Sequence, residues 1–191
     1  MTILVVGLVL FLGVHSVRIF AEGFRSRSIA RIGPNAWKGL YTVISLTGFA
    51  LIVWGYGLSR AEGGFLWHPP RWTFHVTALL MMVSFILLVA AYVPGNGIKA
   101  RVGHPMVAGV KVWAFAHLLS NGRVGDVVLF GAFMVWAILN FSAARRRDRA
   151  AGVTSASRGA GRTVVAVVVG VVAYLAFTLA AHRWLIGVRP F

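Results

Sequence analysis

The chain has 191 residues, of which 59% are hydrophobic and 12% are charged, and it carries a net charge of +15 and no cysteine. Soluble domains average about 25% charged residues, so this composition excludes an ordinary soluble fold. A chain without cysteine also has no disulfide, no thiolate metal ligand and no catalytic thiol.

Apolar runs long enough to cross a bilayer recur along the chain, since a hydrocarbon core about 30 Å thick needs about 20 helical residues. The predicted spans are Thr2–Phe20, Trp37–Leu58, Thr73–Val93, Pro105–Ser120, Val124–Phe141 and Thr163–Ile186. The fourth is short and the most polar. The sequence therefore predicts an all-α, polytopic membrane bundle of about six transmembrane helices in a single domain over residues 1–191.

The basic residues sort by loop. Thirteen flank the first, third and fifth connections: Arg18, Arg25, Arg27, Arg31, Lys38, Lys99, Arg101, Arg145, Arg146, Arg147, Arg149, Arg158 and Arg162. Five lie in the other loops and the tail: Arg60, Arg71, Arg123, Arg183 and Arg189. This positive-inside bias predicts that both termini are periplasmic in a bacterial inner membrane. Topology and attraction to anionic lipid account for the charge, so no nucleic-acid partner is expected.

The stretch from Arg145 to Arg162 (RRRDRAAGVTSASRGAGR) is rich in arginine and in small and polar residues. This composition predicts a flexible cytoplasmic loop over about residues 145–162. The Val/Ala-rich span that follows has no ionisable residue before His182, which is typical of a helix that packs against lipid.

Ionisable groups at membrane depth are costly and usually functional, so the histidines need an account. There are six: His15, His68, His75, His104, His117 and His182. A solvated loop explains His68, and interfacial positions explain His75 and His182, although His75 stays open as an alternative ligand. The other three lie in or beside spans.

One histidine directly precedes the fourth span and a second lies within it, and an Asn-Gly pair ends the span. His104 and His117 are thirteen residues apart, about 20 Å along a helix and about 140° around it, so they cannot bind one metal ion together. His117 lies about 18 Å beyond Pro105, where an imidazole needs a hydrogen bond or a metal. His104 stands at the helix entry, where capping, a headgroup contact or a cofactor contact are all open.

The third histidine, His15, lies in the first span with Arg18 three residues on. A membrane boundary near Arg25 would put His15 about 15 Å deep, close to the level of His117. A boundary at Arg18 would match His15 with His104 instead. The sequence leaves both alternatives open.

The cations near these histidines have few carboxylate partners. Arg18 can reach Glu22 one turn on. Lys111, on the face of the fourth span that carries His104, has no acid near it in sequence. It either extends towards the cytoplasm or meets a non-protein anion, such as a haem propionate or a lipid phosphate.

Two histidines on different helices, nearby cations, aromatic residues and no carboxylate ligand are typical of a b-type haem pocket. Zinc fits less well, because its sites show closer ligand spacing or acidic partners. The residues alone leave open which pair of these histidines would bind the iron. Arg18, Lys111 and possibly His104 would lie beside the cofactor's carboxylates.

Three segments carry a family resemblance. GHPMVAGVKVWAFAHLLSNG (residues 103–122) resembles the signature of the NnrU family of bacterial membrane proteins. GVHS near the start and WKGLYTVISL in the second span resemble its other blocks, so the resemblance covers nearly the whole chain. The signature often begins with Arg, where this chain has Gly103. The resemblance implies a role in denitrification and nitric oxide metabolism.

The same blocks resemble plant zeta-carotene isomerase, a membrane haem b protein that isomerises a polyene. That resemblance implies axial ligands at His15 and His117, with His104 matching a further histidine. The isomerase has a cysteine where this chain has Ala114, so no thiolate can replace an imidazole here. The implied partners are nitric oxide or an apolar substrate from the bilayer, and an electron donor.

Two other classes stay open. The His-Pro-Met run resembles isoprenylcysteine-type methyltransferases, in which His104 would lie at S-adenosylmethionine, but the chain has no acid after Asp148. A non-catalytic assembly or transport factor is the other alternative. A Soret band would discriminate haem from both.

Overall fold

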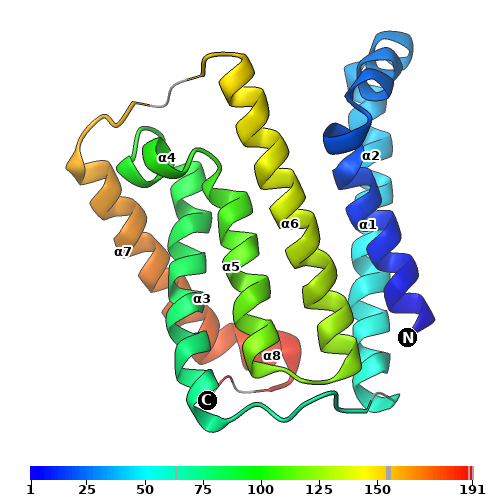
Figure 1. Cartoon of the computed structure of the whole chain (residues 1–191), viewed down its shortest axis with the longest axis vertical. Helices are drawn as coiled ribbons and strands as arrows, with labels where there is room; N and C mark the ends of the chain where they lie inside the picture. The colour runs from blue at the N-terminus through cyan, green and yellow to red at the C-terminus, as the bar shows by residue number, and fades with distance from the viewer. Residues whose placement is uncertain (63, 154–155, 189, 191) are drawn as a thin grey trace. The chain divides into compact units, whose positions relative to one another are not determined.

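A computed structural model describes residues 1–62, 64–153, 156–188 and 190. Arg189 and residues 154 and 155 of the predicted loop lie outside these ranges. The helices are α1 (Thr2–Phe20), α2 (Glu22–Glu62), α3 (Arg71–Tyr92), α4 (Gly97–Val102), α5 (Pro105–Ser120), α6 (Val124–Ala150), α7 (Ala160–Ala176), the π-helix η1 (Phe177–Ala181) and α8 (His182–Ile186) (Figure 1). Between them the described residues form one isolated β-bridge and no longer strand.

Five helical segments are long and apolar enough to cross a membrane: Thr2–Phe20, Glu22–Ala61, Arg71–Tyr92, Val124–Ala150 and Ala160–Ile186. The fourth predicted span, α5, is apolar but has 16 residues, short of a full crossing. The chain is a polytopic helical membrane protein, as its composition predicts.

Boundaries of the observed helices differ from the predicted spans where polar residues extend a helix. α2 begins at Glu22, well before the predicted start at Trp37, and changes direction at Gly33. The backbone of Gly33 has φ 82°, which glycine adopts without a steric cost. α6 continues beyond Phe141 to Ala150. Residues 145–150 and 160–162 of the predicted loop are therefore helical.

The chain divides into two compact units, each described here by itself. Unit 1 consists of Met1–His68 and Asn121–Asn140, and unit 2 consists of Pro69–Ser120 and Phe141–Phe191. The division falls within α6, so the first part of this helix belongs to unit 1 and its last part to unit 2.

In unit 1, α1 runs alongside α2 at a glycine-lined contact (Figure 1). A Cβ on Gly7 would lie 2.6 Å from the backbone nitrogen of Ile52, and a Cβ on Gly48 would lie 2.7 Å from that of Phe11. A Cβ on Gly55 would meet the backbone of Leu4. Small residues let membrane helices approach this closely, because lipid supplies no hydrophobic force between them.

In unit 2, α3 lies beside both α5 and α7 (Figure 1). Hydroxyls of α3 donate across to carbonyls of α5: Ser84 Oγ to Gly109 at 2.8 Å, and Thr77 Oγ1 to Ala116 at 2.9 Å. On the α7 side a Cβ on Gly170 would lie 2.6 Å from Ile86 Cα. Side-chain hydrogen bonds thus join the α3–α5 pair.

Candidate functional site

His15 lies half-buried on α1 of unit 1. Its Nδ1 is 2.6 Å from the carbonyl of Phe11, one turn earlier. A carbonyl can only accept, so Nδ1 carries the proton and Nε2 carries the lone pair. This is the arrangement that a histidine needs to bind a metal through Nε2.

Aromatic rings from three helices surround the His15 imidazole. Phe11 of α1 stacks on it with centroids 4.2 Å apart, Tyr41 of α2 lies at 5.1 Å, and Trp136 of α6 meets it edge-on at 6.1 Å. All of these residues belong to unit 1. The ring is therefore fixed by its own helix and by two others.

Two polar atoms of this surrounding lack a hydrogen bond. Among the described residues, Trp136 Nε1 and Ser45 Oγ are buried without a hydrogen-bond partner. Ser45 stands one turn after Tyr41 on α2, close enough to interact with the phenol but without hydrogen-bond geometry. Buried donors normally find an acceptor, so these two indicate that the surroundings of His15 are suited to a further group.

His117 lies half-buried on α5 of unit 2 with the same local geometry. Its Nδ1 is 3.0 Å from the carbonyl of Trp113, and the two rings have centroids 5.4 Å apart. The proton is again on Nδ1, so Nε2 carries the lone pair. The preceding carbonyl, that of Ala116, accepts from Thr77, which ties this part of α5 to α3.

The donor chemistry of these two histidines fits a haem. A porphyrin supplies four nitrogen ligands to iron, so the protein needs to supply only two. In the described part of the chain no three or more of His, Asp and Glu come together in a cluster that could hold a metal ion. The two candidate ligands lie in different units. In each, a hydrogen bond from Nδ1 to the carbonyl four residues earlier orients the imidazole ring.

His104 has a protein partner that its sequence neighbours do not reveal. Its Nε2 lies 2.8 Å from Asp148 Oδ2, on the last part of α6 within unit 2. Its ring also meets Phe141 edge-on at 6.3 Å. The pair is part-exposed, with 29% and 31% of the two side chains accessible. His104, which directly precedes α5, is thus paired with a carboxylate that lies 44 residues later in the sequence.

Lys111 lies on the His104 face of α5, as the spacing predicts. Its Nζ stands 4.8 Å from the centroid of the same Phe141 ring. A cation over an aromatic face is stabilised by the ring's quadrupole, which gives this ammonium a partner inside the unit.

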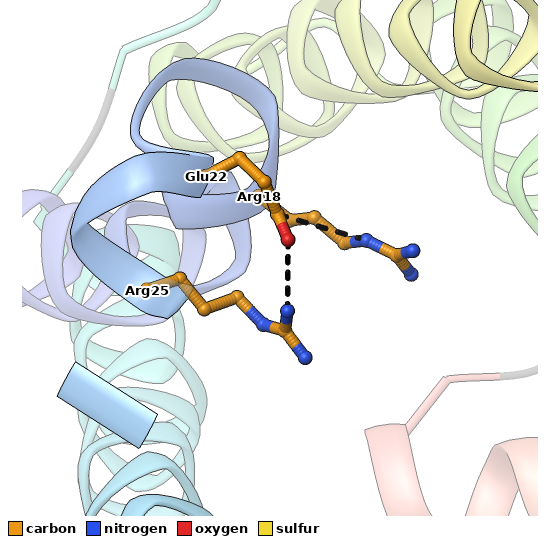
Figure 2. Close-up of polar contacts among 3 residues, drawn as sticks. All are labelled: Arg18, Glu22 and Arg25. Atoms are coloured by element: carbon orange, nitrogen blue, oxygen red, sulfur yellow. Dashed lines mark hydrogen bonds and ion pairs between the residues drawn. The ribbon is translucent and has the colours of Figure 1, made fainter. Parts of the chain in front are cut away.

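Arg18 takes part in a surface cluster with Glu22 and Arg25 (Figure 2). The predicted i,i+4 pair is present, with Arg18 Nε 3.8 Å from Glu22 Oε2. Arg25 Nη1 is closer to the same carboxylate, at 2.9 Å. The Arg18 side chain is 62% exposed, so one acid shared between two arginines leaves a net positive charge near the start of α2.

The remaining histidines are His182, His68 and His75. His182 Nδ1 is 2.8 Å from the carbonyl of Val188, and His68 lies in the loop before α3, 4.7 Å from the ring of Phe65. His75 is exposed near the start of α3.

Sequence reasoning missed Tyr41, Ser45 and Trp136. Tyr41 and Ser45 are four residues apart in the second span and so share a helix face, which is a signal that the sequence does carry. The sequence carries no signal for Trp136, because only tertiary packing brings this residue close to His15.

Comparison with known proteins agrees with the expected family. A family model described as NnrU protein matches residues 3–190, nearly the whole chain. Neither the curated proteins nor the solved structures contain a match to this chain. On the evidence of that match, the chain belongs to the NnrU family.

Proposed function

We propose that this NnrU family membrane protein binds haem b through His15 and His117. The observation that carries the proposal is the shared geometry of the two imidazoles: each donates Nδ1–H to the carbonyl four residues before it and keeps the Nε2 lone pair. Such a bond fixes the ring's orientation and raises the basicity of the nitrogen that binds a metal.

Other residues would hold the cofactor's carboxylates. Arg18 and Arg25 share the single carboxylate of Glu22, so the cluster has a net positive charge that can attract an anion. Lys111, whose ammonium lies over Phe141, is the second candidate. His104 is engaged with Asp148, so this role for it would require that pair to open.

Bound haem would supply electron transfer or ligand binding at iron. The family membership and the resemblance favour a role in nitric oxide metabolism, or in isomerising an apolar polyene that enters from the bilayer. In either case this chain's residues bind and orient the cofactor and exclude water from it. The proposed location is a bacterial cytoplasmic membrane with both termini periplasmic.

The test is an absorption spectrum of the full chain purified in detergent. The parent should show a Soret band, and His15→Ala and His117→Ala should each lose the spectrum of a six-coordinate bis-histidine haem. His182→Ala, which removes a histidine at the far end of the last span, is the matched control and should keep it. Retention of the parent spectrum in both ligand variants would refute the assignment.

A colourless parent separates the alternatives. Binding of S-adenosylmethionine by that protein would favour a methyltransferase, with His104 at the cofactor. Binding of neither would favour an assembly or transport factor.

A further inference from the structure

The unpartnered indole of Trp136 is the most informative group outside the proposed ligands. Its Nε1 is buried without a partner among the described residues. An unmade hydrogen bond on a buried donor has a substantial energetic cost, because the group has given up water without replacement. The indole ring lies edge-on to His15, so the unmet donor belongs to the surroundings of a proposed ligand.

Unit 1 offers these surroundings hydrogen-bond donors and no carboxylate. Trp136 contributes an N–H, and Ser45 contributes a second buried donor without a hydrogen bond. The sequence of α1 contains no acid, and α2 has none between Glu22 and Glu62. In the unit 1 part of α6 the acid is Asp126, which already accepts from Tyr56 at 2.7 Å and from the Arg123 backbone at 3.0 Å.

No carboxylate of these segments is thus open to the Trp136 donor, and a bound ligand can supply the acceptor. Within the proposed function, protoporphyrin offers carboxylates as peripheral acceptors, since its other substituents are methyl and vinyl groups. A hydrogen bond to a carboxylate is stronger than one between neutral groups, and an apolar surrounding increases the difference.

We propose that a carboxylate of the porphyrin accepts hydrogen bonds from Trp136 Nε1–H and Ser45 Oγ–H. This inference rests on the proposed function and adds to it a pair of cofactor-binding residues that carry no charge. Arg18, one turn beyond His15, would attract the same carboxylate electrostatically, whereas the neutral donors would select for its oxygen atoms.

The experiment titrates the cofactor-free full chain in lipid nanodiscs with ferric protoporphyrin IX and, separately, with its dimethyl ester. Trp136→Phe should weaken binding of the free acid roughly tenfold or more, as expected for a lost hydrogen bond to a charged group. Against the dimethyl ester the same variant should lose no more than about threefold, since the ester oxygens are uncharged.

The matched control is Trp54→Phe, on α2 of the same unit, where the indole is 59% exposed. It should change neither affinity. Should Trp136→Phe fail to fold by circular dichroism, Ser45→Ala takes its place, with a smaller loss for the free acid alone.

The outcomes separate the two proposals. A wild-type chain that binds neither porphyrin overturns the proposed function and this inference together. A chain that binds haem, but whose Trp136→Phe variant loses nothing, or loses equally for acid and ester, overturns this inference alone; the donors then serve a bound water or the packing.

Discussion

The two proposed ligands sit in regions that fix a histidine-bearing helix by different means. In unit 1, α1 is held against α2 by glycines, and the Gly48 contact falls on Phe11, whose carbonyl receives the His15 proton. In unit 2, α5 is held against α3 by hydroxyls, and Thr77 bonds the residue just before His117. The α1–α2 contact thus depends on the absence of side chains, whereas the α3–α5 contact adds hydrogen bonds to a close approach at Gly109, whose Cβ would lie 3.1 Å from the Ser84 carbonyl oxygen.

The largest expected effect comes from filling the glycine contact. Gly48→Val should destabilise the protein by about 3 kcal/mol, because its Cβ would lie 2.7 Å from the Phe11 backbone nitrogen and the helices must separate. Unfolding in mixed micelles of increasing denaturing detergent measures the loss.

The control for that variant lies on the same helix. A Cβ on Gly39 has nothing within 4 Å, so Gly39→Val should cost well under half as much. Equal losses for the two variants would remove the contrast between the units.

A smaller effect is expected from the corresponding change in unit 2. Thr77→Val keeps the shape of the side chain and removes the bond to the Ala116 carbonyl, which should cost about 0.6 kcal/mol, the average for such bonds between membrane helices. The same unfolding assay reports it, with the exposed Thr47→Val as the control. A loss as large as that of Gly48→Val would show that hydroxyls fix α5 as tightly as glycines fix α1.

The smallest effect is expected at the surface cluster of unit 1. Glu22→Gln removes the ion pairs of Glu22 with Arg18 and Arg25. The side chains of Arg18 and Glu22 are 62% and 45% exposed, so the loss of stability should stay below about 1 kcal/mol and become smaller in high salt. Unfolding at low and high salt measures it. A large, salt-independent loss would mean that the cluster, rather than the glycines, holds the start of α2.

The fold was predictable where an apolar run ends at clear signals. The bounds of α1 and α5 agree with the predicted spans. For α5 the signals are clear, because Pro105 suits the first helical position and the Asn121-Gly122 pair follows the last. The early start of α2 was not predicted, because residues 22–32 contain several arginines and a search for apolar runs does not detect a charged helix. The charged C-terminal end of α6, beyond Phe141, was not predicted for the same reason.

The candidate site was predictable only as far as contacts are local. The Arg18–Glu22 pair follows from helical spacing, and the i−4 bonds of His15 and His117 lie within single helices. The His104–Asp148 pair and the packing of Trp136 on His15 join residues 44 or more positions apart, and nothing in a single sequence fixes which distant residues meet.

Synthesis of the chain encounters the two units in an interleaved order. The ribosome makes most of unit 1, then α3 to α5 of unit 2, and only then the stretch of α6 that returns to unit 1. The hairpin of α1 and α2 can pair early, because its contacts are close in sequence. Trp136 is made afterwards, so the surroundings of His15 are complete only once about 70% of the polypeptide has been synthesised, and the cofactor proposed there would be inserted late in biogenesis.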